Sequence, residues 1–140
     1  MIDDRQTLVT ESAYDYAQVT ATGNGNIIDM AGYESLTYVL YIDTVTTADS
    51  SNYFTFTVYG DSDSAMGTQV VLASTDIIGT AWVINENSAT YTDDTTHEIG
   101  VKCSVAANRY YRLTCTETLT ADATFAVIAI KGHALTKPTS

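Results

Sequence analysis

The chain has 140 residues and a formal charge of −11, with 17 carboxylates against six Lys and Arg. This length suits one domain that buries roughly two-thirds of its unfolded surface. An acidic surface repels phosphates, so we expect no nucleic acid as a partner. We also expect no membrane partner, because no apolar run could span a bilayer and the start, MIDDRQTL, is too acidic and polar for a secretory signal.

The charge is distributed unevenly along the chain. Residues 1–100 hold Arg5 as their only cation against 15 carboxylates, a balance of −14, and residues 101–140 hold five cations against two carboxylates, a balance of +3. Strands from the two halves can interleave in space and mix these charges, which is the interpretation we favour. The alternative is a less acidic pole that docks on an acidic partner.

Thr, Val, Ile and ten Tyr dominate the sequence, and this composition is typical of half-buried strands. Asn24-Gly25, within GNGN, predicts a two-residue hairpin between strands near 14–22 and 26–30, because both residues tolerate positive φ. Gly32 then turns the chain into a long strand over 34–45. We expect Leu36, Leu40 and Ile42 in the core and Tyr41 available to a second surface.

The middle of the chain continues the strand pattern. Residues 53–59 alternate cleanly, with Phe54, Phe56 and Val58 on one face. The loop GDSDSAMG precedes a strand near 68–73. Short strands are predicted near 82–84 and 89–92, where the pattern is less clear.

The C-terminal part predicts a hairpin from strands at 98–105 and 109–116. In that register Cys103 and Cys115 lie about four residues apart along the ladder, on the order of 13 Å. A disulfide needs Cα atoms within about 7 Å, so we expect two reduced, packed thiols. The last strand, 124–131, is apolar on both faces, which fits a strand covered on both sides or one that faces a neighbouring subunit.

These elements predict an all-β fold, a two-sheet antiparallel sandwich of about eight short strands, in jelly-roll-like form. We expect an N-terminal arm over residues 1–12, which could become ordered on binding. A single β-sandwich domain would follow over residues 13–134. A polar tail over 135–140 would hold Pro138, the one proline.

Residue types that carry catalysis are scarce. The two histidines, His97 and His133, lie near no recognisable nucleophile motif, and no G-x-S-x-G occurs. Exposed loop histidine is the simpler interpretation of both. We therefore predict that the protein is not an enzyme, with no catalytic residue and no cofactor.

Two acidic clusters are candidate metal sites. Asp61-Ser62-Asp63 could begin a calcium loop, but no further ligands follow at the required positions. Asp93 and Asp94 with His97 and Glu98 match no defined ligand spacing. A solvated acidic turn is favoured for the first cluster, and we expect no bound metal.

The tyrosines are scattered through the strands rather than gathered in loops. On strands, tyrosine is more often a half-buried packing residue with its hydroxyl at the surface. An interface between proteins is the second interpretation, because tyrosine is enriched there. Stacking of the rings on sugar faces stays open as a third.

An ordered series of weak motifs from about residue 26 to 138 resembles small structural proteins of tailed bacteriophages. These motifs are ID at 28–29, GYESLTYV at 32–39, a strand at 53–59, GDSD at 60–63, YYRLT at 110–114, KGH at 131–133, and a final proline. Within that group, the chain is similar to candidates for capsid decoration, or cement, proteins. The resemblance implies a homotrimer on the outside of the capsid, bound to the major capsid protein, without enzymatic activity or cofactor.

That resemblance implies localisation to the outer surface of the virion, after synthesis in the host cytoplasm. The alternative is a tail or baseplate β-sandwich component that binds a glycan or receptor. A protein that acts by adhering needs contact area, and both the arm and the basic residues offer it. The interface candidates are Arg5, Leu8, Tyr41, Lys102, Arg109 and Arg112.

Overall fold

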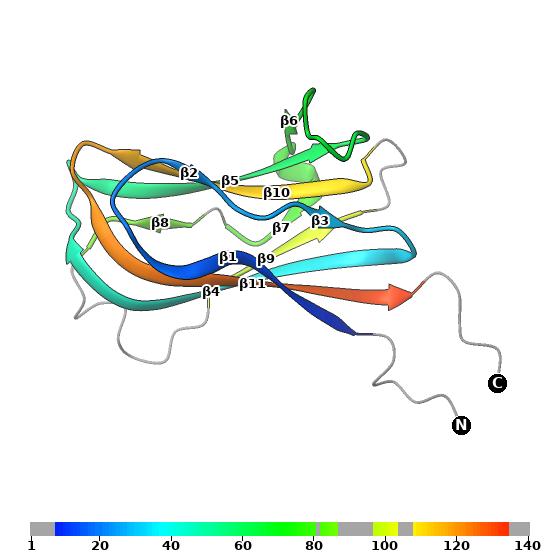
Figure 1. The fold of residues 1–140 in the computed structure, drawn as a ribbon, viewed down its shortest axis with the longest axis horizontal. Coiled ribbons are helices and arrows are strands. Elements are labelled where there is room, and N and C mark those ends of the chain that lie inside the picture. Colours follow the sequence, from blue (N-terminus) through cyan, green and yellow to red (C-terminus); the bar gives the residue numbers. More distant parts are fainter. Residues whose placement is uncertain (1–7, 81, 87–96, 104–107, 135–140) are drawn as a thin grey trace.

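A computed structural model describes residues 8–80, 82–86, 97–103 and 108–134. Within them, eleven strands form two antiparallel sheets that stack as layers (Figure 1). The strands of the first sheet, sheet A, are in spatial order β1 (Val9–Val19), β11 (Asp122–Ala134), β4 (Tyr33–Thr47), β9 (His97–Lys102) and β7 (Ile77–Ile78). The predicted all-β sandwich is confirmed, with more strands than the eight expected.

The second sheet, sheet B, is built around the pairing of β10 with β5 along their whole length. Short strands border this pair, with β2 and β3 beside β10 and β6 and β8 beside β5. The strands of sheet B are β2 (Gly23–Asn24), β3 (Ile28–Asp29), β5 (Tyr53–Asp61), β6 (Val70–Val71), β8 (Val83–Ile84) and β10 (Tyr110–Thr118). A short 3-10 helix, η2 (Ser74–Asp76), lies between β6 and β7.

The predicted hairpin of residues 98–105 and 109–116 is wrong. Strand β9 pairs with β4 and β7 in sheet A, whereas β10 pairs with β5 in sheet B. Strands β10 and β11 both lie between strands from the acidic N-terminal half, so the two halves interleave as we favoured.

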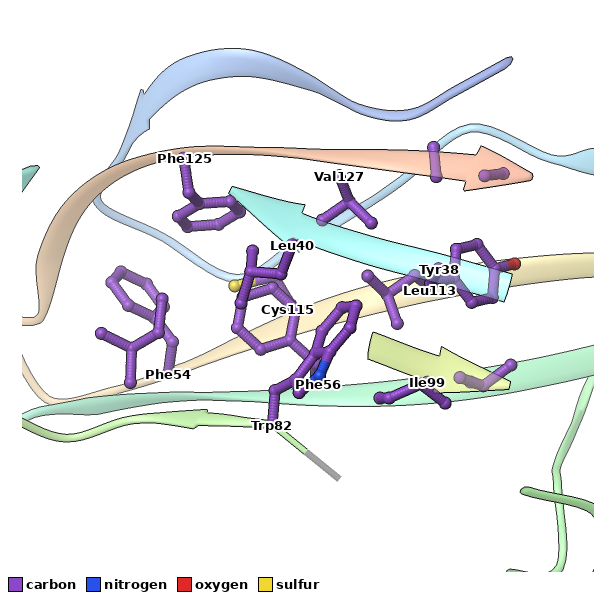
Figure 2. Packing of buried hydrophobic residues seen from close by; sticks show 14 of the residues in the cluster. Tyr38, Leu40, Phe54, Phe56, Trp82, Ile99, Leu113, Cys115, Phe125 and Val127 are labelled. Carbon is purple, nitrogen blue, oxygen red and sulfur yellow. The ribbon is translucent and has the colours of Figure 1, made fainter. Parts of the chain in front are cut away.

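Alternation along the central strands builds the core between the sheets. On β4, Leu36 and Leu40 are buried, as predicted, and Tyr38 is buried with them, whereas Ile42 is only partly buried against the core. On β5, Phe54, Phe56 and Val58 are buried. Figure 2 shows side chains from both sheets pointing into the space between them. Because successive side chains of a strand point to opposite faces, the same alternation sends the remaining residues outward.

Phe125 of β11 lies at the centre of an aromatic cluster that joins the sheets. Its ring centroid is 5.3 Å from that of Phe56 and 6.0 Å from that of Phe54, both on β5. Tyr14 of β1 approaches it at 5.2 Å, and Trp82 packs against Phe56 at 5.7 Å. Edge-to-face contacts at such distances add about 0.5–1.5 kcal/mol each beyond the burial of apolar area.

The segment around Gly25 closes one side of the sandwich. Gly25 N donates to Leu113 O of sheet B at 2.8 Å, and Asn26 N donates to Ala13 O of sheet A at 2.7 Å. Figure 1 shows this blue segment, which carries β2 and β3, running between β1 and β10. The Asn24-Gly25 hairpin is therefore a wrong prediction, because neither residue has positive φ and the segment pairs with β10. Gly25 is needed for close approach of two backbones.

Residues 70–80 and 82–84 border both sheets on the opposite side of the sandwich. Strand β6 and strand β8 border β5, and β7 borders β9 in sheet A. Leu72 N donates to Val58 O at 3.0 Å, and Phe56 N donates to Trp82 O at 3.2 Å. These contacts occupy backbone groups of β5 that would otherwise form an open sheet edge, and strands of two residues are a common protection against edge-to-edge aggregation. Strand β7 was not predicted.

The two cysteines are free, as expected. Cys115 is fully buried and Cys103 is half-buried. Burial raises the pKa of the Cys115 thiol to about 12 and that of Cys103 to about 11. Both are therefore packed, protonated thiols at neutral pH.

Gly25→Ala tests the closure between the sheets. A Cβ at this position would lie 2.3 Å from Ala13 O and 2.8 Å from Leu113 O, and both atoms belong to backbone. We expect a loss of at least about 2 kcal/mol in the free energy of unfolding, measured by chemical denaturation. Gly67→Ala is the matched control, because its Cβ would meet only Asp63 Oδ2 at 3.9 Å. Similar losses in both variants would contradict the role of Gly25.

Tyr38→Phe tests a buried polar group in the core. The Tyr38 hydroxyl is fully buried and has no hydrogen-bond partner within the described residues, and burial raises its pKa. Removing it should increase the free energy of unfolding by about 1 kcal/mol, since an unpaired buried hydroxyl is destabilising. In Tyr111→Phe, by contrast, a hydroxyl that donates to Asn108 O at 3.4 Å is lost, and no gain is expected. A destabilised Tyr38→Phe variant in thermal melts would refute this account.

Candidate interaction surface

The outer face of sheet A combines exposed apolar and aromatic side chains. Tyr16 of β1, Tyr41 of β4 and Ile128 of β11 have exposed fractions of 61%, 58% and 46%. Val39 pairs with Ile128 in register, and Val39 and Ile130 are half-buried on the same face. We use the term sheet-A face for these five residues.

Strand β11 shows why this face is apolar. Phe125, Val127 and Ala129 point into the core and are fully buried. The alternate residues, Ile128 and Ile130, therefore point outward, and Ile128 remains 46% exposed. The predicted strand with two apolar faces is confirmed, and its second face is available for contact with another molecule.

A hydrogen bond fixes the aromatic end of the sheet-A face. Tyr16 Oη donates to Asp43 Oδ2 at 2.8 Å. Since β11 lies between β1 and β4, this bond reaches across β11. The bond to Asp43 also raises the pKa of the Tyr16 phenol. Tyr16 is therefore held in place on the surface, which lowers the entropy lost on binding.

Among the described cations, Arg109 and Lys131 are neutralised by carboxylates. Arg109 Nε and Nη2 each donate to an oxygen of Asp29 at 2.8 Å, and this bidentate contact lowers the pKa of the Asp29 carboxyl. Lys131 is buried and forms an ion pair with Glu11. Its Nζ also donates to Asp29 O at 3.2 Å and lies 5.0 Å from the centroid of the Tyr33 ring.

Lys102 and Arg112 are held by neutral groups instead. Lys102 Nζ donates to Thr75 O at 2.8 Å. Arg112 Nη2 donates to the side-chain oxygen of Gln69, on the outer face of sheet B. Gln69 and Thr75 both lie close to β6 and η2. Among the described residues, neither Lys102 nor Arg112 forms an ion pair with a carboxylate.

The structure does not bring the five described interface candidates together. Tyr41 lies on the sheet-A face, and Arg109 lies at the start of β10, 54% exposed in its side chain. Leu8 is 61% exposed beside β11. Residues 9–12 of the expected arm lie in β1, and Arg5 falls outside the described residues. Ile128 and Tyr16 were missed as interface candidates, although the outward apolar residues of 124–131 were the signal for Ile128.

The Asp61 loop is arranged against cation binding. The Asp61 carboxylate accepts hydrogen bonds from the backbone N–H groups of Asp63 at 3.0 Å and Thr68 at 2.8 Å, and from the Thr68 hydroxyl. Donors therefore surround the oxygens that calcium would need. Within the described residues, no group of three His, Cys, Asp or Glu could hold a metal. Asp93 and Asp94 of the second predicted cluster lie outside them.

In the described part of the chain, no helix is both long and apolar enough to cross a membrane. No family model matches the chain, and no curated protein matches it. Among solved structures, the chain is similar to the infectious bursal disease virus VP2 subviral particle, with 13% sequence identity and a TM-score of 0.29. The match covers 91% of this chain and 42% of that chain, and a likeness this distant carries no conclusion about function.

Asp61→Asn tests the hydrogen-bonded loop through pH. The N–H of Asp63, followed by the Thr68 groups, holds the pKa of the Asp61 carboxyl below its usual value. This group therefore stabilises the fold above its unfolded pKa of about 3.9, and the contribution is lost as pH falls through the lower folded pKa. We expect the Asp61→Asn variant to have a lower Tm than wild type at neutral pH. On acidification, its Tm should fall by less than that of wild type. Parallel curves for the two proteins would contradict this assignment.

Proposed function

We propose that this protein is a non-enzymatic virion structural protein that binds the outside of a bacteriophage capsid as an oligomeric cement protein. The observation that carries the proposal is the sheet-A face, an exposed apolar and aromatic surface on a rigid central sheet. Such a surface is typical of protein interfaces, where tyrosine is enriched and charge is depleted. The choice of a bacteriophage capsid as the partner follows from the ordered motifs that resemble those of small tailed-phage structural proteins.

A cement protein stabilises a shell by mass action. Any protein that binds the assembled state in preference to free subunits shifts the equilibrium toward assembly. A homotrimer that binds the major capsid protein through three equivalent contacts gains avidity, so each contact can be modest. The chemistry required is contact area held in a fixed shape, and two stacked sheets around the Phe125 cluster supply it.

A second candidate is a tail or baseplate component that binds a glycan or receptor. Tyr16 and Tyr41 are both exposed on one face, and the Asp43 carboxylate accepts a hydrogen bond from Tyr16. Aromatic rings beside a carboxylate can stack on a sugar ring and accept its hydroxyl protons. This arrangement favours the glycan over other receptor chemistries.

Removing residues 1–7 tests the role of the N-terminal arm in shell binding. Strand β1 begins at Val9, so this deletion leaves β1 and the Lys131–Glu11 ion pair in place. We expect a folded oligomer that no longer cosediments with expanded shells, whereas wild type does. Removal of residues 135–140 is the matched control and should retain binding.

Cryo-electron microscopy of purified virions locates the protein directly. Knobs on the outer shell that fit this sandwich would support the cement proposal. Density confined to the tail would overturn it in favour of the second candidate. Unchanged cosedimentation after removal of residues 1–7 would refute the arm as the shell contact while leaving the location to be decided by the density.

A further inference from the structure

We infer that Asn24 is a site of spontaneous deamidation, and that the closed fold suppresses this modification until residues 23–30, the closure segment, open. Asn24-Gly25 is the one Asn-Gly pair in the sequence. Asn is among the chemically labile residues, and a following glycine, which has no side chain, leaves its own backbone nitrogen free to approach the Asn side chain. The inference concerns the lifetime of the folded chain and does not depend on what the protein binds.

The reaction needs only water as a co-reactant. Gly25 N attacks Asn24 Cγ, the Cγ–Nδ2 bond breaks, and ammonia leaves with the proton that Gly25 N loses. Water then opens the resulting cyclic imide at either of its carbonyl carbons. One opening gives aspartate at position 24. The other gives isoaspartate, in which the main chain runs through Cγ and is longer by one carbon atom.

Strand β10 binds both of the reacting groups. Gly25 N, the attacking atom, donates to Leu113 O at 2.8 Å. Thr114 Oγ1 donates to Asn24 Oδ1 at 2.8 Å, which holds the side-chain amide against β10. Asn24 lies in β2, where its register with Thr114 is fixed. Because the attacking nitrogen must turn from Leu113 O toward Asn24 Cγ, the reaction requires that β2 separates from β10.

The closure segment is also bound to sheet A. Asn26 N donates to Ala13 O at 2.7 Å. Asn26 Nδ2 donates to Ser12 O at 3.0 Å and to Asp15 Oδ1 at 3.2 Å. Strand β2 has only two residues, so the segment can open locally at a lower free energy than the two sheets need to unfold. This locally open state is the one in which the reaction proceeds.

Isoaspartate at position 24 prevents the segment from closing again. Gly25 lies so close to both sheets that an added Cβ would be 2.3 Å from Ala13 O and 2.8 Å from Leu113 O. A main chain that is longer by one carbon atom displaces Gly25 from this narrow space. The bonds from Gly25 N to Leu113 O and from Asn26 N to Ala13 O then cannot both form. The modification therefore makes a reversible opening permanent.

Peptide mapping by mass spectrometry tests the protection of Asn24. Wild type is incubated at mildly alkaline pH, both folded and unfolded in guanidinium chloride. Electron-transfer fragmentation distinguishes isoaspartate from aspartate at position 24. We expect the folded chain to react at least about 10-fold more slowly, because only its open fraction reacts. Equal rates, or an unfolded chain that forms no isoaspartate, would overturn the inference.

Asn26→Ala tests whether opening of the closure segment controls the rate. This change removes the side-chain hydrogen bonds from the segment to β1 and leaves the Asn24-Gly25 pair intact. We expect deamidation of the folded variant to be at least about 3-fold faster than in wild type, in line with the net contribution of a hydrogen bond. Asn52→Ala is the matched control, because it removes similar bonds from the turn of residues 49–52.

Circular dichroism establishes that these variants are folded. If Asn26→Ala fails to fold, Thr114→Val replaces it, because this change removes the donor to Asn24 Oδ1. A rate equal to that of wild type, or an equal rise in Asn52→Ala, would contradict control by the closure segment.

Hydrogen exchange of the aged protein tests the permanent opening. Ion-exchange chromatography separates the deamidated chains by their added negative charge. In chains that carry isoaspartate, we expect the amides of Gly25 and Asn26 to exchange at least about 10-fold faster than in unmodified protein. Asn24→Asp is the matched control, because it adds the same charge without lengthening the main chain, and its amides should stay protected. Protected amides in the isoaspartate chains would refute the permanent opening.

Discussion

The packing of Phe125 between the two sheets is the contact on which the remaining structure depends. Its ring meets Phe54 and Phe56 of β5 and Tyr14 of β1, so one side chain of β11 connects three strands, counting β11 itself. Burying a Phe in this way typically contributes several kcal/mol, and truncation to Ala in such cores costs about 3–5 kcal/mol. Once Phe125 points inward, the alternation of β11 is set, and Ile128 must point outward.

The two faces of β11 therefore lie in different environments. The inward residues of β11 are apolar because they fill the core, but the outward Ile128 contributes nothing to that core at 46% exposure. A monomer in water would be better served there by a polar β-branched residue, as on sheet B, where Thr55 and Thr57 occupy outward positions of β5. The two outer faces therefore differ in polarity at comparable outward strand positions.

Local pattern was sufficient for the strands whose alternation is long and clean. Strands β4 and β5 and their buried faces could be predicted because apolar residues occur at every second position, from Leu36 to Leu40 on β4 and from Phe54 to Val58 on β5. The local pattern could not predict which strands pair with each other, because β9 and β10 are neighbours in the sequence but belong to different sheets. Gly25 shows the same limit, because its Asn-Gly signal is local whereas its close approach to Ala13 and Leu113 is set by tertiary packing. Tyr41 was predicted at the surface, but its proximity to Tyr16 depends on which strand flanks β11.

The net charge of −11 acts against the exposed apolar residues of the sheet-A face when molecules of this protein meet. Like charges repel molecules that approach one another, and this repulsion opposes association through the exposed Ile128 and Tyr41. Within the described residues, Arg109 and Lys131 are already neutralised by Asp29 and Glu11, so few cations are left to offset this repulsion. The apolar face and the acidic charge therefore act in opposite directions when two molecules approach.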